Sequence, residues 1–529
     1  MEIYTKLKTA DFVVIGVYLF AVVALGFWVS YRRRGSEDLF LGDRSFGWFN
    51  VGLSIFGTNV SPSMMISTAA ISYSLGMVGA YCDWLAWGLM MLSAMVFVPH
   101  YLNTRITTMP EFIRRRFDER CRTVLTILSI LSVLILWLGG TLYAGGVLLS
   151  QLLNWPFWLS CTVLMVIATS FTVAGGLAAV IITDTFQSIL MILSSTLLAV
   201  IMFVKVGGFQ GLVDNVPAAD WQLFRPIADK EFPWPAVVMG YCVAGIWFWC
   251  TDQTIVQRVL GARSIPQGQM GVFFAAAIKV FSPLIFFVPG IMCKVLHPDL
   301  ASPDDAYATM VTTHLPVGFV GLIVAVLIAA LVSTIDSGLN SLSTVFTIDL
   351  YARFNKEASA HKRKQVGRIV TLVAAFGAVL FALSIRSLPS ENMFVLLGTI
   401  ISYIAPTMSA VFIVGVLWKR ANSTAAFHTL VWGSLASMIT GVAHLKEWPS
   451  KEFWPHFMYV SSIIFGVLVV MMVVLSLLTR KSDEEEELPS IAEGYRKLKV
   501  SVKPVWAAWG VLALVMTFIY VFFQVISRK

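Results

Sequence analysis

A polar stripe interrupts the apolar stretch from residue 329 to residue 351, which reads AALVSTIDSGLNSLSTVFTIDLY. Its hydroxyl and amide side chains recur at steps of three and four residues, and therefore share one face of a helix: Ser333, Ser337, Asn340, Thr344 and Thr347. Asp336 lies beside them. Lipid offers such groups no partner, so this face must contact protein, water or an ion. Oxygen ligands with a negative charge suit a hard cation such as Na⁺, whereas the simpler alternative is hydrogen bonding between helices.

Three more charged residues, Asp83, Asp184 and Lys279, lie within apolar runs. An ionised group at such depth needs a partner or a wet cavity. Lys279 and Asp83 could form a structural pair, or they could line a cavity and bind a polyhydroxylated solute that stacks on Trp249. Asp184 could instead lie near the inner membrane boundary. The sequence contains no HExxH, GxSxG or phosphate-binding glycine loop, so we do not expect an enzyme.

The elements that hold these residues are predicted to be transmembrane helices. The chain is 57% hydrophobic and only 13% charged, which indicates an all-α integral membrane protein. Apolar runs recur from end to end, and we predict fourteen transmembrane helices near residues 11–30, 46–73, 77–100, 123–150, 154–173, 177–204, 233–252, 268–293, 317–350, 367–386, 390–417, 424–443, 456–479 and 505–526.

The basic residues predict the orientation of these helices. With the N-terminus outside, most of the 38 Lys and Arg, Arg258 among them, fall in inward loops. Both termini are therefore expected to face outside. The net charge of +8 then reflects topology, and no nucleic-acid partner is expected. The first run is too long for a removed signal peptide, and we expect a multi-pass protein of a bacterial inner membrane.

Two of the predicted spans read as interrupted helices. Residues 57–63 read GTNVSPS, in which Pro62 removes a backbone donor. The seventh span carries Gly240 and Gly245 before an aromatic cluster at 247–249. Polar breaks at equivalent places in two five-helix halves are typical of inverted-repeat transporters, in which unwound backbone offers carbonyl groups to a cation. The alternative is that Pro and Gly are simply frequent in membrane helices.

Three strings are specific enough to suggest a family: WCTDQTIVQR at 249–258, GGLAAV followed by TDT within 175–185, and NSLSTVFTID at 340–349. With these strings the chain resembles the sodium/solute symporter family, and most of all its sodium–glucose cotransporter branch. The resemblance implies Na⁺ as the coupling ion and a small polar solute, a sugar, as cargo, with no obligate protein partner. It also implies a LeuT-type five-plus-five inverted-repeat core at 46–418, with halves at about 46–204 and 233–418, and peripheral helices within 1–45 and 419–529.

The resemblance also assigns ion sites, position by position. The family's main sodium site falls on Gly57, Val60, Ala330, Ser333 and Thr334. The first three contribute backbone carbonyl groups, and the last two contribute side-chain hydroxyl groups. A further sodium site, known in some members, falls on Asp184, Ser333, Asp336 and Ser337. Asp336 stands where the family usually has Ser or Thr. This second carboxylate could strengthen cation binding, which we prefer, or could be protonated and make coupling pH-sensitive.

The sugar site transfers less completely. It falls on Asn59, Met64, Asp83, Gly245, Trp249, Lys279 and Gly398, with Phe248 as the inner gate. Asp83 replaces a Glu, Phe248 replaces a Tyr, and Met64, Gly245 and Gly398 lack the polar side chains found in relatives. Each lost hydrogen bond to a solute hydroxyl costs about 1–3 kcal/mol. These departures argue against recognition of ordinary glucose and leave a modified hexose, a bulkier sugar, inositol and an acidic sugar held by Lys279 open as solutes.

We thus expect sodium-coupled symport of a sugar-like solute by alternating access. The residues alone leave three alternatives open. A proton-coupled carrier would titrate Asp336 or Asp184, a sodium-gated sensor or leak channel of the same fold would pass current without accumulating solute, and an intramembrane enzyme is the least favoured.

Overall fold

The structure, a computed structural model, describes residues 7–32, 38–229, 231–386, 393–480 and 503–528. The regular structure within these ranges is helical, and twelve helices are long and apolar enough to cross a membrane. This confirms the prediction of an all-α membrane protein. Two shorter apolar helices, Met64–Leu75 and Phe157–Ser170, coincide with the second and fifth predicted spans. The total of fourteen transmembrane helices stays a prediction.

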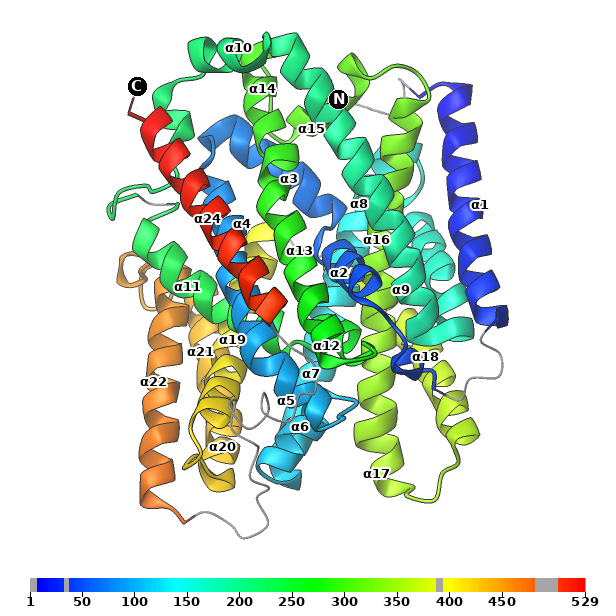
Figure 1. The fold of residues 1–529 in the computed structure, drawn as a ribbon, viewed down its shortest axis with the longest axis vertical. Coiled ribbons are helices and arrows are strands. Elements are labelled where there is room, and N and C mark those ends of the chain that lie inside the picture. Colours follow the sequence, from blue (N-terminus) through cyan, green and yellow to red (C-terminus); the bar gives the residue numbers. More distant parts are fainter. Residues whose placement is uncertain (1–6, 33–37, 230, 387–392, 481–502, 529) are drawn as a thin grey trace.

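The helices follow one another in a single bundle (Figure 1). In chain order they are α1 (Thr9–Arg32), α2 (Trp48–Asn59), α3 (Pro62–Leu75), α4 (Val78–Leu92), α5 (Val98–Asn103), α6 (Met109–Arg116), α7 (Glu119–Ser132), α8 (Thr141–Leu153), α9 (Phe157–Val206), α10 (Gly208–Asn215), α11 (Trp234–Ile246), α12 (Gln253–Leu260), α13 (Ile265–Phe286), α14 (Val288–Leu296), α15 (Asp305–His314), α16 (Phe319–Val345), α17 (Ala352–Phe354), α18 (Ala360–Arg386), α19 (Met393–Leu417), α20 (Ser423–His428), α21 (Ser434–Leu445), α22 (Phe457–Leu478) and α24 (Lys503–Ile526). Stretches of wider, π-helical turns join some of them, including η4 (Val133–Gly140), η6 (Trp247–Thr251) and η7 (Phe346–Tyr351).

The second predicted span is broken where the sequence indicates. Helix α2 ends at Asn59, Val60 is extended, and α3 begins at Pro62. The side chain of Ser61 accepts a hydrogen bond from the backbone N–H of Met64 at 3.2 Å and so caps α3. Proline at the first helical position loses no hydrogen bond, because that N–H has no partner in a helix. The break therefore follows from local sequence.

The seventh span is also broken, but not at the glycines. Gly240 and Gly245 lie within the continuous helix α11, so the prediction that they interrupt the span is wrong. The backbone instead becomes extended at Asp252, between η6 and α12, where the Asp252 carboxylate accepts the N–H of Thr254 at 2.9 Å. A Cβ atom at Gly240 would lie 2.8 Å from the backbone oxygen of Met458. This glycine therefore allows α22 to approach closely.

Helix α16 lies at the centre of the bundle and is held at one end by α1. In the span Phe319–Phe354, 89% of the most apolar window is buried, the largest share among the twelve long helices. Asp11 of α1 is buried, and its Oδ1 accepts the backbone N–H groups of Gly318 and Gly321, each at 2.8 Å. The first turn of α1 and the last turn of α24 lie at the same end of the bundle (Figure 1). This agrees with termini on one side of the membrane; that the side is outside stays a prediction.

Candidate ion and solute sites

Asp184 lies at the centre of a buried polar cluster. Its Oδ2 accepts a hydrogen bond from Ser54 of α2 at 2.6 Å, and its Oδ1 accepts one from Ser333 of α16. The Asp184 side chain, on α9, is fully buried within the protein. Three helices that are distant in sequence therefore converge on one carboxylate.

The break after α2 lies against this cluster. A Cβ atom at Gly57 would lie 2.2 Å from Ser188 Oγ and 3.5 Å from the backbone oxygen of Asp184. Thr58 Oγ1 lies 3.2 Å from Ser337 Oγ of α16. The broken helix thus packs against α9 and the hydroxyl-bearing face of α16, which is the arrangement that the sequence predicted.

Two other residues of the predicted main sodium site, Val60 and Thr334, are also buried. Val60 is the extended residue after α2, and it is fully buried. Thr334 Oγ1 donates to the carbonyl of Ala330, one turn earlier in α16, at 3.0 Å. Among the described residues no three His, Cys, Asp or Glu side chains gather as a transition-metal site would. The donors that gather here are hydroxyl, carbonyl and carboxylate oxygens, which suit Na⁺.

Arg258 completes the cluster, although the sequence analysis had counted it in an inward loop. Its guanidinium lies 3.7 Å from Asp184 Oδ2, donates to Ser337 Oγ, and is fully buried in α12. Asp336 Oδ1 lies 3.3 Å from Ser337 Oγ, while its Oδ2 has no hydrogen-bond partner among the described residues. When all three groups are ionised, two carboxylates and one guanidinium carry one net negative charge, which favours a cation.

A sequence signal for Arg258 did exist. It follows Ile255, Val256 and Gln257 without any loop-forming residue, so the apolar segment continues past Asp252. Counting basic residues by loop missed this, because the count assumes that each helix ends where its apolar run weakens.

Lys279 of α13 forms the centre of a second polar cluster. Its Nζ donates to Asp83 Oδ1 at 2.7 Å and to Asn59 Oδ1 at 2.9 Å. Ser282 Oγ donates to Asp83 Oδ2 at 3.1 Å, and the ring of Trp249 lies 5.7 Å from Nζ. An ammonium group has three N–H donors, so one remains available to a solute. The pair is thus a real ion pair that could also bind a solute.

The aromatic cluster lies where α11 gives way to α12. Phe248 stacks on Trp137 of η4, with ring centroids 5.5 Å apart, and meets Trp249 edge-on at 4.7 Å. Trp137 Nε1 in turn donates to Asp252 Oδ2 at 3.4 Å. Phe248 therefore lies beside both the break and the Lys279 cluster, a position that suits a gate.

The remaining predicted solute residues are less informative. A Cβ atom at Gly245 would lie 2.2 Å from Leu89 Cδ1, so Leu89 fills the space that a polar side chain would need. Met64 is half-buried at the start of α3 and packs against the core. Gly398 belongs to α19, but its surroundings lie outside the part of the chain whose side chains are described.

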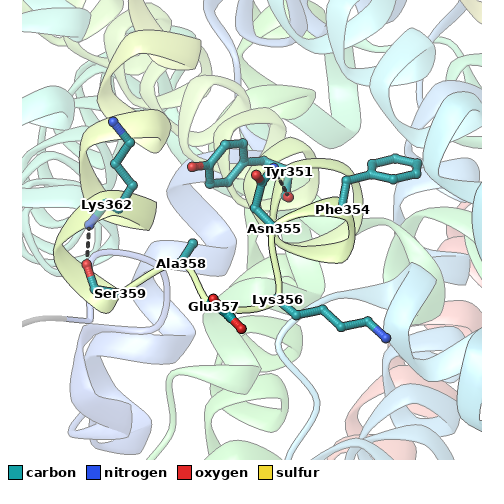
Figure 2. A pocket seen from close by; sticks show the side chains of 8 residues that line it. All are labelled: Tyr351, Phe354, Asn355, Lys356, Glu357, Ala358, Ser359 and Lys362. Carbon is teal, nitrogen blue, oxygen red and sulfur yellow. Dashed lines mark hydrogen bonds between the residues drawn. The ribbon is translucent and has the colours of Figure 1, made fainter.

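A surface pocket of about 550 Å³ lies elsewhere, at the loop between α17 and α18 (Figure 2). Its lining residues come from the loop and from the ends of the flanking helices: Tyr351, Phe354, Asn355, Lys356, Glu357, Ala358, Ser359 and Lys362. None of them belongs to either buried cluster. This pocket is therefore separate from the candidate ion and solute sites.

A helical membrane bundle with two broken helices beside buried polar clusters is typical of secondary transporters of LeuT type. The chain matches the sequence model of the Sodium:solute symporter family over residues 39–433, and it belongs to this family. It is 32% identical to the sodium/myo-inositol cotransporter 2 of Oryctolagus cuniculus, over 91% of this chain and 78% of the relative. It is 30% identical to the sodium/glucose cotransporter 4 of Danio rerio, over 90% of this chain and 80% of the relative.

Solved structures agree on the fold. A Na⁺-coupled sialic acid symporter, in a substrate-bound outward-open state, matches with a TM-score of 0.78 at 24% identity, over 90% of this chain and 99% of that chain. A nucleobase-cation-symport-1 family transporter matches with a TM-score of 0.55 at 13% identity, over 89% of this chain and 97% of that chain. The LeuT-type fold and the assignment as a sodium-coupled solute symporter, not an enzyme, are therefore confirmed.

Proposed function

We propose that the chain cotransports Na⁺ with a sugar or a polyol, and that Asn59, Asp83, Trp249 and Lys279 bind this solute. The observation that carries the proposal is the buried Lys279–Asp83 pair, 2.7 Å long, beside the Trp249 ring. Charged and amide groups bind hydroxyl groups, while an aromatic face packs against the apolar side of a sugar ring. The names of the relatives, which include glucose and myo-inositol cotransporters, support a polyhydroxylated ring.

The sodium sites are proposed on the cluster around Asp184. The main site comprises Gly57, Val60, Ala330, Ser333 and Thr334, and a second site comprises Asp184, Ser333, Asp336 and Ser337. Support comes from the hydrogen bonds that Asp184 accepts from Ser54 and Ser333, which gather carboxylate and hydroxyl oxygens of three helices at one point. A transport core at 46–418, peripheral helices on either side of it in the sequence, and a bacterial inner membrane also remain proposals.

The mechanism follows from how these groups are shared between helices. Sodium bound at the break after α2 joins α2 to α16 and thereby favours the outward-open state. The solute then binds beside Lys279, and Phe248 moves aside when the inner side opens. Coupling requires that sodium and solute raise each other's affinity by the same factor. Membrane voltage adds about 2.3 kcal/mol per charge per 100 mV to the driving force.

A second candidate, proton coupling, is favoured by one observation, the buried Asp336 Oδ2 without a hydrogen-bond partner among the described residues. One assay separates sodium coupling from proton coupling. It measures uptake and counterflow of labelled sugars and myo-inositol in proteoliposomes, with sodium or choline and at several pH values. Sodium-dependent accumulation supports our proposal. Accumulation that persists in choline and follows the pH gradient supports proton coupling, and current without accumulation indicates a channel.

A further inference from the structure

The polar face of α16 continues beyond the proposed sodium sites. It runs from Ser337 through Asn340 and Ser341 to Thr344, and all four residues are buried. Ser337 and Thr344 are two helical turns apart, so Asn340 and Ser341 lie between them on the same face. This half of the stripe leads toward the end of the bundle at which α16 passes into the basic loop after Arg353. Sodium binding does not account for it.

Helix α12 packs along this face and bridges it at two levels. Arg258 donates to Ser337 at one level. Gln257 Nε2 donates to Thr344 Oγ1 at 2.8 Å at the other. The residues between the two bridges form a seam between α12 and residues 337–344 of α16, which we call the α12–α16 seam.

Unpaired polar atoms gather along this seam. Those with no hydrogen-bond partner among the described residues are Asn340 Nδ2, Ser341 Oγ, Thr254 Oγ1, Gln257 Oε1 and Arg258 Nε. Native proteins leave few buried polar atoms unpaired, and such atoms usually contact an ordered water or an ion. The two nitrogens among them, Asn340 Nδ2 and Arg258 Nε, are donors that suit water, whereas the three oxygens, of Ser341, Thr254 and Gln257, suit water or a cation.

Gln257 closes the far end of the seam. Its Nε2 also donates to the carbonyl of Phe40 at 2.8 Å, so one amide joins the segment before α2, helix α12 and helix α16. The Gln257 side chain is fully buried. Separation of α12 from α16 must break the Gln257–Thr344 hydrogen bond.

We propose that the α12–α16 seam is the route by which sodium leaves the Asp184 cluster toward the inner side, and that Gln257 seals it. This inference rests on the proposed function. Asn340, Ser341 and Thr344 place side-chain oxygens within about one helical turn of each other, and these oxygens would replace part of the hydration shell of a moving cation. Arg258 lies at the entrance beside Asp184, and Gln257 lies at the exit.

Cysteine accessibility tests the route. Asn340→Cys is made in a background in which the six native cysteines are replaced, and a membrane-impermeant thiol reagent is added to either side of oriented proteoliposomes. We expect labelling from the inner side only, slowed by sodium, and loss of uptake after labelling. Gln257→Ala should raise the labelling rate in sodium about tenfold, because it removes the hydrogen bond to Thr344 that holds the seam closed.

Gln253→Ala is the matched control. Gln253 is also buried in α12, but its hydrogen bonds join the segment at Thr107 and Met109 and not α16. It should therefore leave the labelling rate unchanged. Thr344→Val removes the Gln257–Thr344 hydrogen bond from the α16 side with little change in side-chain shape. It keeps the test valid if the Gln257→Ala variant does not fold.

Two results would overturn the route: position 340 stays unreactive from the inner side in protein that retains sodium-driven uptake, or the Gln257 and Gln253 variants label at equal rates. Sodium-independent uptake by the unmodified protein would instead overturn the proposed function, so the two failures are distinguishable.

Discussion

Replacing Lys279 by methionine separates its structural role from its proposed role in solute binding. Methionine keeps much of the length of the side chain and removes all three N–H donors. Two of these donors contact Asn59 and Asp83, at 2.9 and 2.7 Å, so a bound solute can receive one. The variant therefore loses one charge-assisted hydrogen bond to the solute.

The size of the effect follows from that bond. A hydrogen bond to a charged group contributes about 1.5–3 kcal/mol, so the half-saturating solute concentration should rise about 10- to 150-fold at saturating sodium. The variant also leaves Asp83 buried without its cation. Breaking a buried ion pair costs about 3–5 kcal/mol of stability, and we expect the lower value because the Asp83 side chain is 12% exposed.

The assay measures uptake against solute concentration and thermal unfolding on the same preparations. Asp83→Asn combined with Lys279→Met should restore much of the stability but not the solute affinity. Lys294→Met is the matched control, because Lys294 also pairs with an aspartate, Asp220 at 2.6 Å, away from the solute cluster. An unchanged half-saturating solute concentration in Lys279→Met would refute a role in binding and leave Lys279 purely structural.

Three further predictions concern sodium and pH. Ser333→Ala should raise the half-saturating sodium concentration about tenfold, the effect of one lost ligand hydroxyl, measured as sodium-dependent uptake. Asp336→Asn should weaken sodium activation without changing the pH profile of uptake. Burial, followed by the neighbouring His297 and Lys205, lowers the pKa of His314 below its usual value of 6.5. The unfolded chain binds a proton at His314 near pH 6.5, whereas the folded protein binds it only at a lower pH. The thermal stability should therefore fall as the pH drops from about 6.5 through the lowered pKa. His314→Gln should remove that fall.

Each of these has a control and a contrary result. Ser343→Ala removes a hydroxyl that bonds to Gly367 of α18 and should leave sodium activation unchanged. Equal effects of Ser333→Ala and Ser343→Ala would contradict the main site. A pH dependence of uptake that disappears in Asp336→Asn would instead support proton coupling. An acid-sensitive melting temperature that persists in His314→Gln would show that other groups cause it.

The sequence was sufficient to predict those structural features that are caused by residues close together in the chain. Apolar length predicted the spans, and Pro62 with the small polar residues around it predicted the break after α2. The hydroxyl stripe predicted which face of α16 meets other polar groups, because helical periodicity relates residues on one helix. Charged residues within apolar runs pointed to Asp184 and Lys279, and the resemblance to the family gave each of them an expected role.

The sequence was insufficient to predict those features that are caused by packing between segments far apart in the chain. Ser54 and Asp184 are 130 residues apart, and neither position indicates the other. The glycine at 240 looked like a helix break, yet it allows α22 to approach, which only the packed structure reveals. Arg258 was assigned to a loop because the start of a new helix, α12, after Asp252 depends on a cap and on buried partners.

The contact between Asp11 and the first turn of α16 has a practical consequence. Two backbone N–H groups at the start of α16, the helix that carries the proposed sodium ligands, take their acceptor from the first helix. Truncation of the first forty residues would remove Asp11 and leave both donors without that acceptor. Any shortened form of this transporter should therefore keep its first helix, even if that helix never touches the cargo.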